Sequence, residues 1–265
     1  MSVIVVTGAG GIGLACCRRL GAGHALLLAE ADDGRRDAAV AILRDEGFDA
    51  RGHAIDVSDA ASVADLAREA SSLGTLAALV HTAGLSPTMA SGLRILQVNL
   101  LGTALLIESF GELATVGSVA VVVASMAGHL WPTDPAMEAA VATAPAASVV
   151  EATGLPPDVD PETAYAVSKR GVQLRVVAAA LPWGARGARI VSVSPGMIAT
   201  PMGHQESAAQ PFMGVMLDNS PIPRLGTPSE IAEAVAWLAG PDAGFITGTD
   251  LLVDGGVVAS LRGWS

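Results

Sequence analysis

A tyrosine and a lysine in this chain are placed to act together on a proton. Tyr165 and Lys169 are the only tyrosine and the only lysine of the 265 residues, and they lie four positions apart in a segment predicted to be helical. At that spacing two side chains share one face of a helix. A phenol has a pKa of about 10, too high for a base at neutral pH, and a neighbouring ammonium group favours the phenolate. The pair therefore predicts general acid/base chemistry at Tyr165.

A glycine-rich turn near the start of the chain is typical of a dinucleotide site. Gly8, Gly10 and Gly13 follow the first predicted strand and open the first predicted helix with the spacing G-x-G-x-x-G. Glycine permits a tight turn and a close approach of pyrophosphate, and the helix N-terminus offers free N–H groups. Turns that bind nothing also carry this pattern, so its place between strand and helix is what favours a cofactor. The expected phosphate-binding residues are Gly8, Gly10, Gly11, Ile12 and Gly13.

An acidic residue ends the second predicted strand. Glu30 lies 17 residues beyond Gly13 and can accept hydrogen bonds from both hydroxyls of an adenosine ribose, whereas it would repel the 2′-phosphate of NADP. Asp32 is a competing candidate for this place, and Arg35 or Arg36 could serve a phosphate. We expect NAD(H) to be favoured over NADP(H). Further cofactor contacts are expected after the third and fourth strands, at Asp56, Val57, Ala83 and Gly84.

The elements that would position these residues alternate along the chain. Short apolar strands are predicted at 3–7, 25–30, 52–56, 76–81, 119–125, 189–194 and 250–253, and helices at 12–20, 34–46, 60–72, 89–113, 164–181 and 229–239. Strands rich in Val and Leu without polar alternation are typical of a parallel sheet buried on both faces. The alternation predicts one α/β domain over residues 1–265, a Rossmann-type doubly wound sheet of about seven strands with helices on both faces.

Two segments interrupt this alternation. Residues 129–163 hold six of the fifteen prolines, and residues 196–228 are rich in Gly, Pro and Met. Long irregular segments inside a compact domain are usually functional. We expect residues 129–163 to be an inserted, lid-like segment and residues 196–228 to be a mobile substrate loop.

The composition excludes several classes of partner. A net charge of −11 disfavours nucleic acid and anionic membranes, and no stretch approaches the roughly 20 uncharged apolar residues of a membrane helix. Cys16 and Cys17 are adjacent, which suits neither a disulfide nor a metal-ligand set. We expect a soluble, cytoplasmic protein that binds a small-molecule substrate and holds no metal.

The ordered motifs resemble the short-chain dehydrogenase/reductase family across nearly the full length. The matching residues are the turn at 7–13, Asp56-Val57, Ala83-Gly84, Asn99 within 98–102, Ser125 within 124–128, Tyr165 with Lys169, Pro195-Gly196 with Thr200, and the motifs at 247–248 and 253–256. Ser125 and Tyr165 are farther apart than is usual in the family. The inserted segment 129–163 resembles that of the 3-alpha-hydroxysteroid dehydrogenase/carbonyl reductase branch.

The resemblance implies a role for each matching residue. Tyr165 is the general acid/base, and Ser125 hydrogen-bonds the substrate oxygen. Lys169 binds the nicotinamide ribose and lowers the pKa of Tyr165. Asn99 holds a water that passes protons on to the lysine. The nicotinamide carboxamide is held by Thr200 and the backbone of Ile198, after Pro195 and Gly196.

Two departures from the family pattern bear on the site. The glycine turn is one residue shorter than the usual Thr-Gly-x-x-x-Gly-x-Gly, so the phosphate contacts could follow a different path. His81-Thr82 stands where the family usually has Asn-Asn. We interpret His81 as a structural residue and not as a catalytic base.

These residues predict an NAD(P)-dependent enzyme that acts on CH–OH donors. The expected reaction moves a hydride between NAD(H) and a small, largely apolar secondary alcohol or ketone, with steroid- and terpenoid-like molecules among the candidates. Apolar pocket residues are expected at Met126, Trp131, Met197 and Met202. The alternative is a non-catalytic dinucleotide-binding sensor on the same fold, which predicts decay of the catalytic residues.

The resemblance also predicts a homo-oligomer. Family members commonly assemble through two helices, here 89–113 and 164–181, and the insertion enters just before the second. Its bulk and its acidic side chains would hinder packing of this helix pair against a second copy. We therefore expect a homodimer more than a tetramer.

Overall fold

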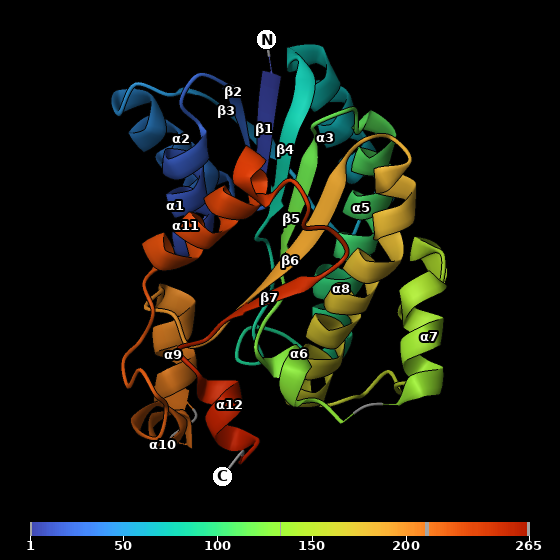
Figure 1. Cartoon of the computed structure of the whole chain (residues 1–265), viewed down its shortest axis with the longest axis vertical. Coiled ribbons are helices and arrows are strands. Elements are labelled where there is room, and N and C mark those ends of the chain that lie inside the picture. Colours follow the sequence, from blue (N-terminus) through green and yellow to red (C-terminus); the bar gives the residue numbers. More distant parts are fainter. Residues whose placement is uncertain (1, 133, 210–211, 264–265) are drawn as a thin grey trace.

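The computed structural model describes residues 2–132, 134–209 and 212–263, and places a seven-stranded parallel sheet at its centre (Figure 1). The strands are β1 (Ser2–Thr7), β2 (Ala25–Glu30), β3 (Asp49–Ala54), β4 (Thr75–His81), β5 (Val119–Val123), β6 (Arg189–Pro195) and β7 (Asp250–Val253). Their order is β3-β2-β1-β4-β5-β6-β7, so the direction of winding reverses between β1 and β4. In such sheets ligands bind outside the carboxyl ends of the strands at this reversal. The predicted doubly wound fold is confirmed.

Helices cover both faces of the sheet (Figure 1). One layer contains α1 (Gly11–Leu20), α2 (Asp33–Asp45) and α11 (Pro228–Ala239), and the other contains α3 (Ala60–Leu73), α5 (Gly102–Leu113) and α8 (Pro161–Gly184). Each layer shares a separate apolar core with the sheet. The side chains of β2 are buried at all six positions, which explains why this strand carries no polar alternation.

The third strand differs from its prediction. The sequence predicts this strand at residues 52–56, from a short apolar run, whereas β3 spans Asp49–Ala54. Ala50 is its one fully buried residue. It pairs with β2 alone, at the edge of the sheet. An edge strand exposes much of its surface, so polar residues are tolerated and the apolar signal is lost.

The predicted helix 89–113 begins at Gly92 and is not uniform. It consists of α4 (Gly92–Ile95), a π-helical turn η1 (Leu96–Leu101) and α5. The run Gly92–Leu113 is long and apolar enough to cross a membrane by length and composition, with a mean hydropathy of 1.3 in its most apolar window. It carries Arg94, Glu108 and Glu112, so it is not the uncharged stretch that the sequence analysis considered. In addition, 61% of its most apolar window is buried in the structure, as is typical of a core helix.

The inserted segment contains regular structure that was predicted to be irregular. It begins within the short helix α6 (Ala127–Leu130) and holds α7 (Pro135–Thr143) and the 3₁₀ turns η2 (Ala146–Ser148) and η3 (Glu151–Thr153). Asp134 caps α7 by accepting the N–H groups of Ala136 and Met137, and Pro135 takes the first helical position. In Figure 1, α7 lies on the outer side of α8.

The predicted substrate loop 196–228 also contains helices. These are α9 (Pro201–Ala209) and α10 (Phe212–Asp218), and a further short helix, α12 (Val257–Leu261), follows β7. The three lie together beyond the carboxyl ends of the strands (Figure 1). Segment 196–228 therefore covers the edge of the sheet where a ligand is expected.

Candidate active site

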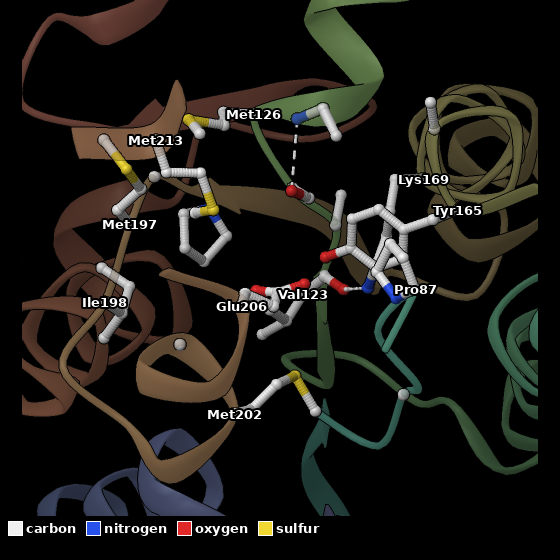
Figure 2. Close-up of a pocket in the computed structure, with 18 of the residues that line it drawn as sticks. Pro87, Val123, Met126, Tyr165, Lys169, Met197, Ile198, Met202, Glu206 and Met213 are labelled. Atoms are coloured by element: carbon white, nitrogen blue, oxygen red, sulfur yellow. Dashed lines mark hydrogen bonds between the residues drawn. The ribbon is translucent and has the colours of Figure 1, made fainter. Parts of the chain in front are cut away.

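Three predicted catalytic side chains meet in one cavity. Tyr165 lies near the start of α8, and its side chain points into the cavity (Figure 2). Lys169 follows one turn later, with Nζ 5.8 Å from the centre of the Tyr165 ring. Lys169 Nζ donates to the Val123 carbonyl at 3.0 Å. Ser125 follows β5 and hydrogen-bonds the Tyr165 phenol. The arrangement brings a hydroxyl, a phenol and an ammonium group to one point.

Burial controls the protonation of this group. Removal from water raises the pKa of the Tyr165 phenol, the negative charge of Glu206 raises it further, and the Ser125 hydrogen bond opposes both. Burial also lowers the pKa of Lys169 to about 8, against the influence of Glu206. Lys169 is therefore mostly charged at neutral pH. Lys169 is expected to lower the pKa of Tyr165, whereas burial raises it. That effect of Lys169 stays a prediction.

Asn99 lies in the π-helical turn, which the sequence reading missed. Its Oδ1 accepts the Leu85 N–H at 2.8 Å, and its Nδ2 donates to the Leu85 carbonyl at 2.9 Å. A Cβ built on Gly84 would lie 3.2 Å from Asn99 Oδ1 and 3.7 Å from Lys169 Nζ, so the backbone passes close to both. Asn99 fixes the chain beside Lys169. The expected water contact stays a prediction.

The glycine turn forms a cradle that fits a dinucleotide phosphate. Gly8 has a φ of +92°, and a Cβ there would lie 2.8 Å from the Ala83 nitrogen. A Cβ on Gly13 would overlap the Gly8 carbonyl oxygen, whereas one on Gly10 meets nothing within 4 Å. Helix α1 starts at Gly11, and Gly10 provides no side-chain cap. The first N–H groups of α1 thus remain available to an anion beside the shortened turn.

Glu30 occupies the end of β2 as predicted, and it is only 9% exposed. Its Oε2 accepts the Ala9 N–H at 2.8 Å and its Oε1 accepts the Asp32 N–H at 3.1 Å. Asp32, the other acidic residue considered for the ribose site, caps α2 instead, since its side chain accepts the Arg35 N–H. Arg36 pairs with Asp33. The acidic group at the turn is therefore Glu30.

Asp56 belongs to a local network beyond the end of β3. Its Oδ1 accepts the N–H and the hydroxyl of Ser58 at 2.9 and 2.6 Å, and its Oδ2 accepts from Arg94 at 3.1 Å. Val57 is buried, and a Cβ on Gly102 would touch it. Sequence reasoning did not identify Arg94, which comes from α4 and orients the Asp56 carboxylate.

The cavity has a volume of 340 Å³ and joins the catalytic group to the cofactor residues. All four predicted pocket residues line it, namely Met126, Trp131, Met197 and Met202, together with Ile12, Gly84, Pro195, Gly196, Ile198 and Thr200. Met213, a further methionine expected at the pocket, also lines it, whereas sequence reasoning missed several others, including Leu85, Pro87, Glu162, Glu206 and Phe212. Among its described residues, 129–132 and 134–163, the inserted segment contributes only at its two ends, through Leu130, Trp131 and Glu162. A lid role for its middle stays a prediction.

His81 is fully buried, in agreement with its interpretation as a structural residue. Its Nδ1 lies 2.6 Å from the Thr7 hydroxyl and its Nε2 lies 3.0 Å from the Thr103 hydroxyl. Burial, assisted by the charge of Lys169, lowers the pKa of His81 to about 3. The ring is neutral at physiological pH and joins β1 to α5 beside the site.

A second polar network anchors the turn that carries Ser125. His129 Nε2 lies 2.7 Å from Asp250 Oδ2, and Asp250 Oδ1 accepts the Ser194 hydroxyl at 2.9 Å. Gln173 Nε2 donates to the Ser194 hydroxyl at 3.0 Å and to the Ser125 carbonyl at 3.4 Å. The network ties the turn after β5 to β6, β7 and α8. His129 and Asp250 are far apart in sequence, so no local spacing points to it.

The family models and relatives that match this chain are named as dehydrogenases and reductases. Residues 2–139 match the short chain dehydrogenase family model, and residues 145–258 match a model described as enoyl-(acyl carrier protein) reductase. The chain is 38% identical to the short-chain dehydrogenase/reductase bsc3 of Alternaria brassicicola, over 98% of this chain and 97% of the relative. It is 32% identical to the 3-alpha-hydroxysteroid dehydrogenase/carbonyl reductase of Comamonas testosteroni, over 81% and 91%. The crystal structure of gox2181 superposes with a TM-score of 0.80 at 27% identity, over 97% and 96%.

Proposed function

Since the chain belongs to the short-chain dehydrogenase/reductase family, we propose that it transfers a hydride between NAD(H) and a small, largely apolar secondary alcohol or ketone. The observation that carries this proposal is the meeting of Ser125, Tyr165 and Lys169 in a cavity walled mainly by apolar side chains. Steroid- and terpenoid-like molecules are candidate substrates. The glycine cradle, the free N-terminus of α1 and Glu30 suit the cofactor.

Each catalytic residue has its own role in proton transfer. When bound, the nicotinamide supplies or accepts the hydride. In ketone reduction the Tyr165 hydroxyl donates its proton to the substrate oxygen, and in alcohol oxidation the phenolate accepts it. Ser125 hydrogen-bonds the same oxygen and fixes its position. Lys169 is charged at neutral pH, so it stabilises the phenolate that burial disfavours and holds the nicotinamide ribose. Asn99 holds the adjoining backbone and a water that returns the proton.

The cofactor preference rests on Glu30. Its carboxylate is anchored by two backbone N–H groups beside the glycine turn, where it would face the adenosine ribose of a bound dinucleotide. A ribose hydroxyl adds hydrogen bonds to such a group, and a 2′-phosphate adds repulsion. Arg36 is engaged with Asp33 and Asp37, and Arg35 lies 3.9 Å from Asp32. NAD(H) is the preferred cofactor.

The proposal also covers the oligomeric state and the cellular location of the protein. Helix α7 is fixed to α8, because Glu138 pairs with Arg170 at 2.7 Å and Val141 is fully buried. Arg175 of α8 donates to the Ala144 carbonyl. A rigid α7 on the outer side of α8 hinders a second copy from packing there, which favours a homodimer. The two buried thiols suit a reducing compartment, so the protein acts in the cytoplasm.

A panel of cyclic and open-chain ketones and alcohols tests the proposal. Each is offered with NADH or NAD⁺, and the absorbance of the reduced nicotinamide is followed. Turnover of apolar ring ketones or secondary alcohols is expected. Binding of NADH without turnover of any member would instead favour the dinucleotide-binding sensor.

A further inference from the structure

A carboxylate reaches into the active-site cavity, whose wall is mainly apolar. Glu206 extends from α9 toward Tyr165 and Lys169, on the side of the cavity formed by Met202 and Met213 (Figure 2). Most of the remaining lining residues are apolar, and methionine is the commonest of them. Glu206 comes from a segment for which the sequence predicts no regular structure, so no pattern identified it.

The protein gives this carboxylate little compensation. It lies beside the hydroxyl of Ser86, a fully buried residue. The ion pairs within 4 Å among the described residues do not include Glu206. Lys169, the cation of the cavity wall, donates instead to the Val123 carbonyl and is assigned to the cofactor ribose. Burial raises the pKa of Glu206, and the charge of Lys169 and the Ser86 hydroxyl together oppose this effect only in part.

Partial removal of a carboxylate from water costs free energy, and a hydrogen-bond donor on a ligand offsets part of that cost. Building on the proposed function, we infer that Glu206 determines specificity by accepting a hydrogen bond from a hydroxyl or ammonium group that the substrate carries within a few bonds of its reacting carbon. The substrate is thus an apolar skeleton with a second polar group, such as a hydroxyketone, a diol or an aminoketone.

The same charge excludes another class. A substrate carboxylate would face Glu206, and Glu162 supplies a second acidic group to the wall. Like charges in a cavity of low dielectric repel strongly, so selection against carboxylates accompanies selection for donors. Keto acids and hydroxy acids are therefore poor substrates.

The test compares kcat/KM across a matched ketone series, namely cyclohexanone and its 2-hydroxy, 2-amino and 2-carboxylate derivatives. We expect Glu206→Leu to lower the ratio of the hydroxy to the unsubstituted ketone by roughly ten- to hundredfold, as for a lost hydrogen bond to a charged group. Glu206→Gln keeps an acceptor but removes the charge. It should spare the hydroxyketone, weaken the aminoketone and improve the carboxylate, which separates a hydroxyl from an ammonium requirement.

Glu162→Gln is the matched control, since it removes the other carboxylate of the cavity. It should change the hydroxy-to-unsubstituted ratio by no more than about twofold. An unchanged ratio in Glu206→Leu overturns the inference. A changed NADH dissociation constant with an unchanged ratio also overturns it, because Glu206 would then act on the cofactor.

A binding experiment keeps this inference separate from the proposed function. Cyclohexanol and cyclohexane-1,2-diol are titrated calorimetrically into the complex with NADH, which needs no turnover. Tighter binding of the diol that is lost in Glu206→Leu supports the inference even if no ketone is reduced. Equal binding of the two alcohols to the wild-type protein contradicts it.

Discussion

The carboxylate of Glu30 accepts the backbone N–H of Ala9 at 2.8 Å, across the turn that joins β1 to α1. The acid that should select the cofactor therefore also shapes the phosphate cradle. A second bond, from the Asp32 N–H at 3.1 Å, fixes the rotation of the carboxylate. Because the group is held by main chain, it cannot easily turn away from a 2′-phosphate.

The first prediction follows from this geometry. NAD(H) should bind roughly tenfold or more tightly than NADP(H), a difference of about 1.4 kcal/mol. Calorimetric titration of both cofactors measures it. Asp32→Asn is the control, since this side chain caps α2, and it should leave the preference in place. Equal affinities, or a preference for NADP(H), would show that Glu30 does not face the ribose.

The second prediction concerns acid stability. The folded protein holds His81 neutral with a pKa of about 3, whereas an unfolded histidine has a pKa of about 6.5. Below about pH 6.5 the unfolded state binds the extra proton, so stability is lost as the pH falls toward 3. At pH 5 this loss amounts to about 2 kcal/mol relative to pH 8.

His81→Asn should remove this part of the acid dependence. Urea unfolding of both proteins at pH 8 and pH 5 gives the two differences. The wild type should lose about 2 kcal/mol more than the variant between these pH values. Parallel losses in the two proteins would mean that His81 does not stay neutral in the fold.

The third prediction assigns a positioning role to the His129–Asp250 pair. Asp250→Asn should loosen the turn that carries Ser125 and lower kcat by about tenfold or more, since small displacements of reacting groups are costly. The KM should change less than kcat, and NADH affinity should be kept. His129→Gln retains a hydrogen-bond donor to Asp250, so this variant should keep more of the wild-type kcat than Asp250→Asn does.

His53 and Glu69 provide the matched control for that experiment. They form another histidine–carboxylate pair, between β3 and α3, and neither lines the active-site cavity. Glu69→Gln should leave kcat unchanged. If Asp250→Asn and Glu69→Gln lower the melting temperature equally and both leave kcat intact, the network is structural only.

The fourth prediction concerns the inserted segment. Replacing residues 134–157 with a short Gly/Ser turn uncovers the outer side of α8, and assembly through this helix becomes possible. Light scattering should report a homodimer for the wild type and a larger assembly for the variant. Replacement also exposes Arg175, so circular dichroism must confirm the fold. An unchanged mass together with an unchanged KM would show that the segment neither blocks an interface nor covers the pocket.

The site residues that sequence reasoning identified without the family resemblance are those with a local signature, whereas Asn99 and Ser125 were identified through the resemblance. Tyr165 and Lys169 share a helix face, and the glycine turn follows a strand with four consecutive apolar residues at its centre. Helix starts at Asp134-Pro135 and Asp160-Pro161 also have a local signature, an N-cap residue before proline at the first helical position. The prolines of this segment were interpreted as loop signals, and α7 was therefore missed.

Other residues depend on tertiary placement and leave no local pattern. Glu206 enters the cavity because α9 folds over the carboxyl ends of the strands. His129 reaches Asp250 because β7 lies beside β6. Arg94 meets Asp56 through the position of α4. Such contacts join residues that are distant in sequence, and periodicity within one element carries no information about them.

In the proposed reaction, Tyr165 moves the proton and NAD(H) moves the hydride. Tyr165→Phe removes one hydroxyl and keeps the ring, so the cavity and the cofactor cradle stay intact. With the best substrate of the ketone panel, turnover of NADH should fall by about a hundredfold or more, the size expected for a lost general acid/base. The NADH dissociation constant should stay within about twofold of the wild type. A Phe variant that binds NADH and keeps most of its turnover would contradict the account.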